Sequence, residues 1–252
     1  MERERKLNWY SILYLICVSL LITSIPFSLF IKDENILFII KCLQQIIAII
    51  YINYYIKKNC LTKPLFEKNS KIKILKLTPL LILCFSNIIT SLIGKYDSNV
   101  FNLKLMMFGI IGALFVSIIE EVLFRGVLFE HLKKYHKINI AISLQALFFG
   151  LTHFLNLSSF SQIPAILVQV LYTAFLGIIL GIIYRKTNNL IIPIVFHFLF
   201  NVINQTLSEN LFKIKWDVTF FIVNILIGGF VLLYSILIFK GGSKNVTDDL
   251  DI

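Results

Sequence analysis

Long apolar runs separated by short charged connections dominate the sequence. A helix must present about 20 largely apolar residues to cross a hydrocarbon layer ~30 Å thick, because it rises only ~1.5 Å per residue. Charged residues make up 15% of the chain, whereas a soluble domain carries roughly 25%. The sequence therefore predicts an all-α fold, a polytopic transmembrane helical bundle of about eight spans. The expected spans are roughly 8–31, 36–56, 77–94, 105–129, 138–155, 164–184, 190–206 and 218–239.

The positive charge of the chain lies between these runs. A net charge of +10 would suit a nucleic-acid partner, but most Lys and Arg residues fall in alternate short connections, as they do in cytoplasmic loops of membrane proteins. This alternation predicts that both termini are cytoplasmic. Membrane lipids, and no nucleic acid, are therefore the expected partners of the basic residues, and the oligomeric state is left open.

The fourth expected span contains two adjacent carboxylates and an arginine, in the string SIIEEVLFRGVLF. A charge near the bilayer centre costs at least ~2.5–3.5 kcal/mol, so these groups must be paired, protonated or turned towards a polar cavity. Glu121 and Arg125 are four residues apart and can form an ion pair on one helical face. Glu120 points about 100° away from Glu121 and needs neighbours from other helices. We interpret Glu121 and Arg125 as structural partners and Glu120 as free for chemistry.

Two further spans place aromatic or polar side chains one helical turn apart. In the fifth span, Phe149 and His153 share a face, so the aromatic ring can restrict the imidazole. In the seventh span, His197 and Asn201 share a face of an otherwise apolar helix. Each pair alone is more often a contact between helices than a catalytic site.

The joint occurrence of these polar groups on three helices favours one site over separate packing contacts. A carboxylate beside a neutral imidazole can take a proton from water. A second histidine and an asparagine can donate N–H groups to the oxyanion that forms when water attacks an amide carbonyl. The pattern therefore contains the groups that a hydrolase needs. Gly177 and Gly181 form a GxxxG pattern in the sixth span, which we interpret as a packing face.

The three strings resemble the motifs of the CPBP family, the CAAX protease and bacteriocin-processing family, also called Abi. EEVLFR at 120–125 is similar to its EExxxR motif, FGLTH at 149–153 to its FxxxH motif, and HFLFN at 197–201 to its HxxxN motif. The expected parts of the chain are three N-terminal helices (1–104), the protease-like core (105–206), and the last helix with a short cytoplasmic tail (207–252).

The resemblance implies a glutamate-dependent intramembrane endopeptidase. Glu120 would be the general base that activates water, and His153 would help to hold that water. His197 and Asn201 would stabilise the tetrahedral oxyanion. The supporting residues would be Glu121, Arg125 and Phe149.

The cofactor is left open, because members of the family are often labelled metalloproteases. Two histidines and one carboxylate form a common catalytic zinc set, which here would be Glu120, His153 and His197. The chain has no HExxH pattern. Of the two alternatives, a divalent metal such as zinc and a metal-free water activated by Glu120, we favour the metal-free water.

The depth of these residues in the membrane raises a geometric difficulty. Counting ~1.5 Å per residue from the cytoplasmic ends of the spans places Glu120 about 14 Å deep, His197 about 10 Å and His153 about 22 Å. The simplest solution is a fifth span shifted to about 143–161, which brings His153 nearly level with Glu120. Residues 131–142 would then form an interfacial segment.

The expected function is hydrolysis of a peptide bond in a membrane-associated peptide or protein. In prokaryotic members of the family this activity is linked to bacteriocin immunity or processing. The Ile-, Lys- and Asn-rich composition resembles a bacterial member, so we expect a bacterial plasma membrane and a substrate without a prenyl group. The alternative is a non-enzymatic membrane immunity or scaffold protein that keeps the polar cluster for packing. A transporter is disfavoured, because no paired inverted halves are evident.

Overall fold

The computed structural model describes residues 9–58, 74–156, 163–215 and 217–240. Within these ranges the chain is largely helical, and an isolated antiparallel bridge joins Ser98 to Phe212. The predicted all-α class is therefore confirmed. The tail predicted after Lys240 lies outside the described residues.

The helical elements follow one another with short connections. The α-helices are α1 (Trp9–Ser24), α2 (Glu34–Lys58), α3 (Ser86–Ile93), α4 (Leu103–Glu121), α5 (Glu130–Leu132), α6 (Ile138–Leu151), α7 (Ile163–Thr187), α8 (Ile191–Leu199), α9 (Ser208–Leu211) and α10 (Val218–Lys240). The 3₁₀ helices are η1 (Phe27–Leu29), η2 (Ile74–Phe85) and η4 (Thr152–Asn156). The π-helices are η3 (Val122–Phe129) and η6 (Phe200–Leu207).

The spans follow the order expected from the sequence, but one of the eight expected spans is shorter than a full crossing helix. Seven helical segments in the described chain are long and apolar enough to cross a membrane, and a shorter apolar helix, Thr78–Ile93, accompanies them. The short one joins η2, which contains Pro79, to α3. A 3₁₀ helix rises ~2.0 Å per residue and an α-helix ~1.5 Å, so η2 and α3 together extend about 36 Å, enough to cross ~30 Å of hydrocarbon. The third expected span therefore corresponds to a segment of mixed helical geometry whose length is sufficient for a crossing.

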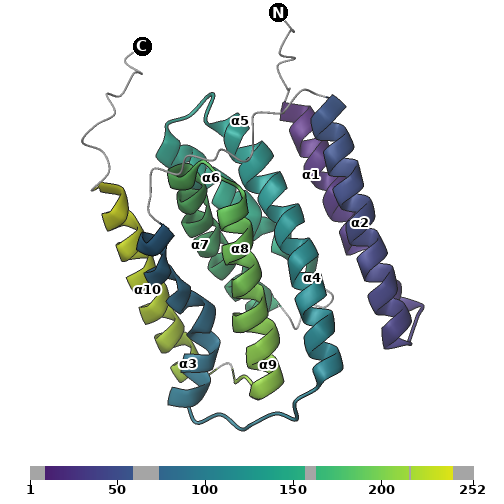
Figure 1. The fold of residues 1–252 in the computed structure, drawn as a ribbon, viewed down its shortest axis with the longest axis vertical. Coiled ribbons are helices and arrows are strands. Elements are labelled where there is room, and N and C mark those ends of the chain that lie inside the picture. The colour runs from purple at the N-terminus through teal and green to yellow at the C-terminus, as the bar shows by residue number, and fades with distance from the viewer. Residues whose placement is uncertain (1–8, 59–73, 157–162, 216, 241–252) are drawn as a thin grey trace, which may run out of the picture.

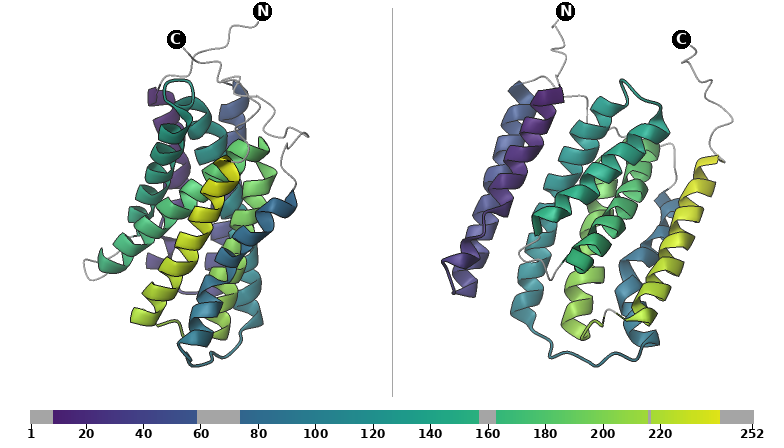
Figure 2. Two further views of the ribbon diagram at one scale, coloured as in Figure 1. Left: turned by 90° about the vertical axis from the view of Figure 1, so that its left-hand side faces the viewer. Right: turned by 180° about the vertical axis from the view of Figure 1, so that it is seen from behind.

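The arrangement of the helices places α4 at the middle of the molecule. Figures 1 and 2 show α4 between the α1–α2 pair on one side and α6, α7 and α8 on the other, with α3 and α10 beyond them. α4 packs on α2, α8 and η6. α1 begins and α10 ends at the same end of the bundle (Figure 1), as an even number of crossings requires. The cytoplasmic location of that end stays a prediction.

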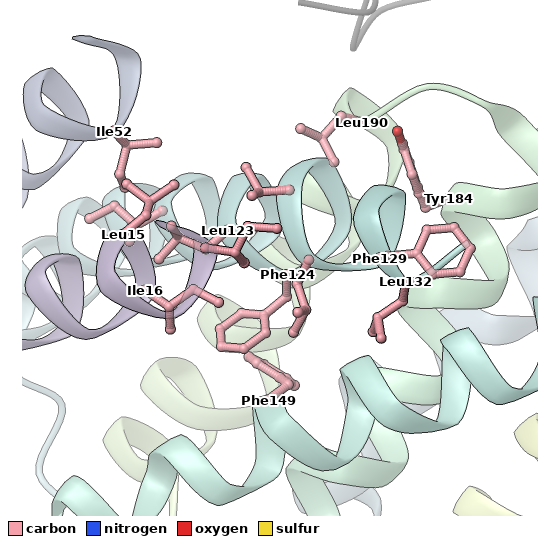
Figure 3. Packing of buried hydrophobic residues seen from close by; sticks show 14 of the residues in the cluster. Leu15, Ile16, Ile52, Leu123, Phe124, Phe129, Leu132, Phe149, Tyr184 and Leu190 are labelled. Carbon is pink, nitrogen blue, oxygen red and sulfur yellow. The ribbon is translucent and has the colours of Figure 1, made fainter. Parts of the chain in front are cut away.

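A buried apolar cluster connects the first two helices to the continuation of α4. Figure 3 shows Leu15 of α1 and Ile52 of α2 in the same cluster as Leu123 and Phe124 of η3. The Phe124 ring meets the Phe149 ring of α6, with centroids 5.1 Å apart. This packing fixes Phe149 beside the charged residues of α4 and η3.

A second set of contacts fixes the start of α4 against the end of the helix formed by α8, η6 and α9. The backbone N–H of Asn102 donates to Asn210 Oδ1 at 2.7 Å, and Asn210 Nδ2 donates to the Asn102 carbonyl at 3.1 Å. Asn102 also caps α4 by accepting from the Leu105 N–H at 3.1 Å. The two helices that carry most of the polar residues are therefore held together at one end by paired carboxamide contacts.

The packing face predicted for the GxxxG pattern is confirmed. A Cβ atom at Gly177 would lie 2.9 Å from Ala146 Cα on α6, and a Cβ atom at Gly150 would lie 2.6 Å from the Val170 carbonyl oxygen on α7. Because glycine has no side chain, α6 and α7 approach with their backbones in close contact.

The shifted fifth span, 143–161, is wrong, and residues 131–142 do not form a separate interfacial segment. α5 ends at Leu132 and α6 begins at Ile138, after a turn. The Lys137 carbonyl accepts the Ala141 N–H at 3.0 Å. The helix begins where the charged turn gives way to a largely apolar sequence. His153 consequently lies in η4, beyond the end of α6.

The close approach of α4 to η6 yields a first prediction. A Cβ atom at Gly109 would collide with the Thr206 side chain, whereas a Cβ atom at Gly112, one turn along α4, would meet nothing within 4 Å. Gly109→Ala should lower the free energy of unfolding by about 1–3 kcal/mol through overpacking. Gly112→Ala should leave it unchanged or raise it by up to ~1 kcal/mol, because alanine favours the helix. Unfolding in detergent measures both, and equal effects would contradict the packing described.

Candidate active site

The ion pair predicted from helical spacing is present. Arg125 Nη1 lies 2.8 Å from Glu121 Oε1, and both side chains are 0% exposed. α4 ends at Glu121, and Arg125 lies in the π-helix η3 that continues it. π-Helical segments occur frequently at functional sites. The Glu121–Arg125 ion pair thus spans the point where the helix changes from α to π geometry.

Two further groups surround the Arg125 guanidinium. Nη2 donates to the Gly177 carbonyl of α7 at 3.2 Å. The guanidinium carbon lies 4.6 Å from the centre of the Phe149 ring on α6. A fully buried charge requires such partners, since the loss of hydration otherwise exceeds the gain from a single ion pair. Arg125 thus connects α4, α6 and α7.

His197 lies between the two adjacent carboxylates. Its Nδ1 is 2.8 Å from Glu121 Oε1, and its Nε2 is 3.7 Å from Glu120 Oε2. The first contact is a hydrogen bond, in which Nδ1–H donates to the carboxylate. The second is longer than a direct hydrogen bond, and one water molecule can bridge such a gap. The prediction that Glu120 finds its neighbour on another helix is confirmed.

The two carboxylates have different surroundings. Glu121 is fully buried and its Oε1 contacts both Arg125 and His197. Glu120 keeps a side chain that is 18% exposed, and its one ion-pair contact within the described chain is His197. The sequence argument that separated a paired carboxylate from a free one therefore agrees with the geometry.

Asn201 faces α4, as does His197 four residues earlier. Its Nδ2 lies 3.5 Å from Ser117 Oγ of α4, at the upper limit of a hydrogen bond. Asn201 follows the change from α8 to the π-helix η6. The predicted common face of His197 and Asn201 is thus confirmed.

His153 is connected to this group through Phe149. Its Nδ1 lies 3.2 Å from the Phe149 carbonyl, and the two rings meet edge to face with centroids 5.5 Å apart. The Phe149 ring also meets His197, at 5.9 Å. The predicted contact of Phe149 with His153 is confirmed. Among the described residues no hydrogen bond or ion pair joins His153 to Glu120, so their proposed cooperation requires a bridging molecule.

The candidate metal ligands do not fit a three-ligand site in this arrangement. Within the described chain no group of three or more His, Cys, Asp or Glu side chains is placed to hold a metal ion. The contacts of His197 Nδ1 with Glu121 and of His153 Nδ1 with the Phe149 carbonyl do not decide this question, because histidines that bind a metal through Nε2 commonly donate Nδ1–H to such partners. No step below is routed through a metal.

Sequence reasoning missed Gln145 and the Gly177 carbonyl. Gln145 is 0% exposed and donates to this carbonyl at 2.9 Å, beside Arg125. The available signal was its position, four residues before Phe149 and on the same face of an apolar helix. The GxxxG pattern identified Gly177 as a packing residue but did not indicate that its carbonyl would accept hydrogen bonds from two side chains.

Comparison with known families agrees with this geometry. Residues 102–203 match the sequence model of the family described as type II CAAX prenyl endopeptidase Rce1-like, part of the CPBP family. This part of the chain is therefore similar to the CPBP family. A search of curated proteins finds no match. The CPBP segment runs from the start of α4 into η6 and contains every residue of the polar group, from Glu120 to Asn201. At the level of the family, the match supports a CAAX-type intramembrane endopeptidase.

The burial of the ion pair in the CPBP segment yields a second prediction. Arg125→Met should lower the free energy of unfolding by about 3–5 kcal/mol, because it leaves the Glu121 carboxylate buried without its partner. Arg185→Met makes the same change at an exposed position near the end of α7 and should change stability by less than ~0.5 kcal/mol. Denaturant titration in micelles compares the two variants. Similar losses in both would show that the buried pair has no special role in stability.

Proposed function

We propose that the chain is a glutamate-dependent intramembrane endopeptidase that hydrolyses a peptide bond in a membrane-associated peptide or protein. The observation that carries the proposal is the position of the His197 ring between two carboxylates, 2.8 Å from Glu121 and 3.7 Å from Glu120. Glu121 holds one side of the imidazole, and the other side faces the Glu120 carboxylate across a gap that a water molecule can fill. This arrangement is suitable for activating water.

In the proposed reaction, a water molecule binds between Glu120 and His197 Nε2. The Glu120 carboxylate takes a proton from the water while the water oxygen attacks the carbonyl carbon of the scissile bond. The proton then passes from Glu120 to the leaving nitrogen, and the C–N bond breaks to give a carboxylic acid and an amine. Atoms and charge balance without a further reactant.

The remaining residues act around this step. Asn201 donates from Nδ2 to the tetrahedral oxyanion, for which its long contact with Ser117 leaves it free. His197 donates to the same oxyanion, a role that requires a proton on Nε2 in addition to the Nδ1–H that faces Glu121. His153 helps to hold the attacking water. A preorganised donor of this kind contributes about 2.7–4 kcal/mol to transition-state stabilisation.

The choice of a metal-free water rests on the placement of the candidate ligands. Among the described residues, no group of three or more His, Cys, Asp or Glu side chains is placed to hold a metal ion. The dependence of the cleavage rate on a chelator tests this choice directly.

The biological setting is proposed from the family and the composition. We place the protein in a bacterial plasma membrane, with cleavage of an unprenylated substrate near the cytoplasmic side and a role in bacteriocin immunity or processing. A neighbouring gene for a small peptide with a Gly-Gly leader, or for its exporter, would support that role.

The catalytic assignment yields a third prediction. Glu120→Gln should lower the cleavage rate of a membrane peptide by the purified protein roughly 10²–10⁴-fold, because it removes the general base. Glu130→Gln is the matched control, since its side chain is 23% exposed against 18% for Glu120 and pairs with Lys133 away from His197. The control should cleave at the rate of the unchanged protein.

The same variants separate the endopeptidase from a non-enzymatic immunity or scaffold protein. The scaffold alternative is supported by the buried contacts of Arg125 with Glu121 and Gly177. These contacts hold helices together whether or not a reaction occurs. A scaffold predicts that a well-expressed Glu120→Gln variant keeps the wild-type phenotype. Wild-type cleavage by Glu120→Gln would refute the proposed mechanism.

A further inference from the structure

One buried polar residue at the edge of the site has no part in the proposed reaction. Gln145 of α6 is 0% exposed, and its Nε2 donates to the Ile142 carbonyl at 3.0 Å and to the Gly177 carbonyl at 2.9 Å. Both acceptors are carbonyl oxygens, so the orientation of the amide is fixed with its nitrogen towards α7. Because the Gln145 amide is fixed, it also restrains any other side chain that donates to the Gly177 carbonyl.

The Gly177 carbonyl is also the acceptor of Arg125 Nη2, at 3.2 Å. Gln145 and Arg125 therefore converge on one oxygen atom from two different elements. α6 contacts the guanidinium a second time through the ring of Phe149, one turn after Gln145, at 4.6 Å. The guanidinium is thus confined between an aromatic face and a carbonyl whose position Gln145 also fixes.

The two glycines of α7 make this arrangement possible in different ways. A Cβ atom at Gly177 would lie 2.9 Å from Ala146 Cα, so this glycine brings the backbone of α7 against α6. A Cβ atom at Gly181 would lie 2.6 Å from Gln145 Nε2, so this glycine leaves the space that the amide occupies. The GxxxG pattern therefore both packs the helices and admits the Gln145 side chain.

We infer that Gln145 is a positioning residue of the site. Through the shared Gly177 carbonyl it fixes Arg125, which holds Glu121, which in turn holds Nδ1 of His197 at 2.8 Å. The expected effect of Gln145 on the cleavage rate rests on the proposed function. Its expected effect on the position of the His197 ring does not.

Gln44 of α2 offers a matched control for a test by substitution. It is 5% exposed, its Nε2 donates to the Ile22 and Ile25 carbonyls at 2.8 and 3.3 Å, and its Oε1 is buried without a partner, as is that of Gln145. The changes Gln145→Met and Gln44→Met thus remove the same chemistry from two buried places. Only Gln145 shares an acceptor with Arg125.

The fourth prediction compares the two variants in the cleavage assay. Both should lower the melting temperature by similar amounts. Only Gln145→Met should lower kcat, roughly 10- to 100-fold with little change in KM, because a small displacement of catalytic groups has an effect of this size. Equal kcat values in both folded variants would overturn the inference, since a merely structural glutamine predicts that result.

A second measurement does not depend on activity. The chain has four histidines, and the ring ¹⁵N signals of His197 can be assigned by their loss in His197→Gln. These signals should shift in Gln145→Met and stay unchanged in Gln44→Met. Unchanged signals in Gln145→Met would overturn the inference even if the protein cleaves peptides. A shift in a protein that cleaves nothing would uphold the inference and refute the proposed function.

Gly181→Ala keeps the inference testable if Gln145→Met does not fold. The added methyl group meets the far end of the Gln145 side chain, which can move away and so lose the Gly177 carbonyl. Gly228→Ala is the control, because its Cβ would make an ordinary contact of 3.4 Å with Phe175. Gly181→Ala should shift the His197 signals and Gly228→Ala should not. No shift with Gly181→Ala would contradict the inference.

Discussion

The fully buried Glu121–Arg125 ion pair determines much of how the helices meet. An arginine within a membrane span needs protein partners for its charge, because the surrounding lipid offers none. Arg125 finds a carboxylate on its own helix, a carbonyl on α7 and an aromatic face on α6. These partners lie on three helices, so the requirement to satisfy one charge brings the three helices together.

The same pair gives the two neighbouring glutamates different roles. Glu121 is occupied by Arg125 and by His197 Nδ1, whereas Glu120 is left facing Nε2 of the same ring. Different surroundings for two adjacent titratable groups are a general way of dividing structural and chemical work. The helix changes from α to π geometry directly after Glu121. A comparable change occurs directly before Asn201, so both helices widen where the polar groups gather.

Much of this site could be predicted from spacing within single helices. The pairing of Glu121 with Arg125, and the common face of His197 and Asn201, follow from side chains four residues apart, and both are observed. The division that places a protease-like core at 105–206 stays a prediction, and the family match covers residues 102–203. The identity of the free carboxylate also followed from spacing, because a helix cannot point adjacent residues in one direction.

Relations between helices could not be predicted in the same way. The depth of His153 was estimated from straight spans of uniform rise, and the shifted fifth span that this suggested is wrong, because α6 begins directly after the charged turn and ends before His153. The 3₁₀ geometry of the third span has no clear signal beyond Pro79. Gln145 was missed because a lone glutamine in an apolar helix has the same appearance in a sequence whether it packs helices or fixes a site.

The central claim is that Glu120 and His197 act together on one water molecule. A double-mutant cycle on kcat tests it with Glu120→Asp, which withdraws the carboxylate by one methylene, and His197→Gln. Groups that act as a unit have strongly non-additive effects. The account predicts that Glu120→Asp slows cleavage greatly in the unchanged protein and far less in the His197→Gln background. The same factor in both backgrounds would contradict it.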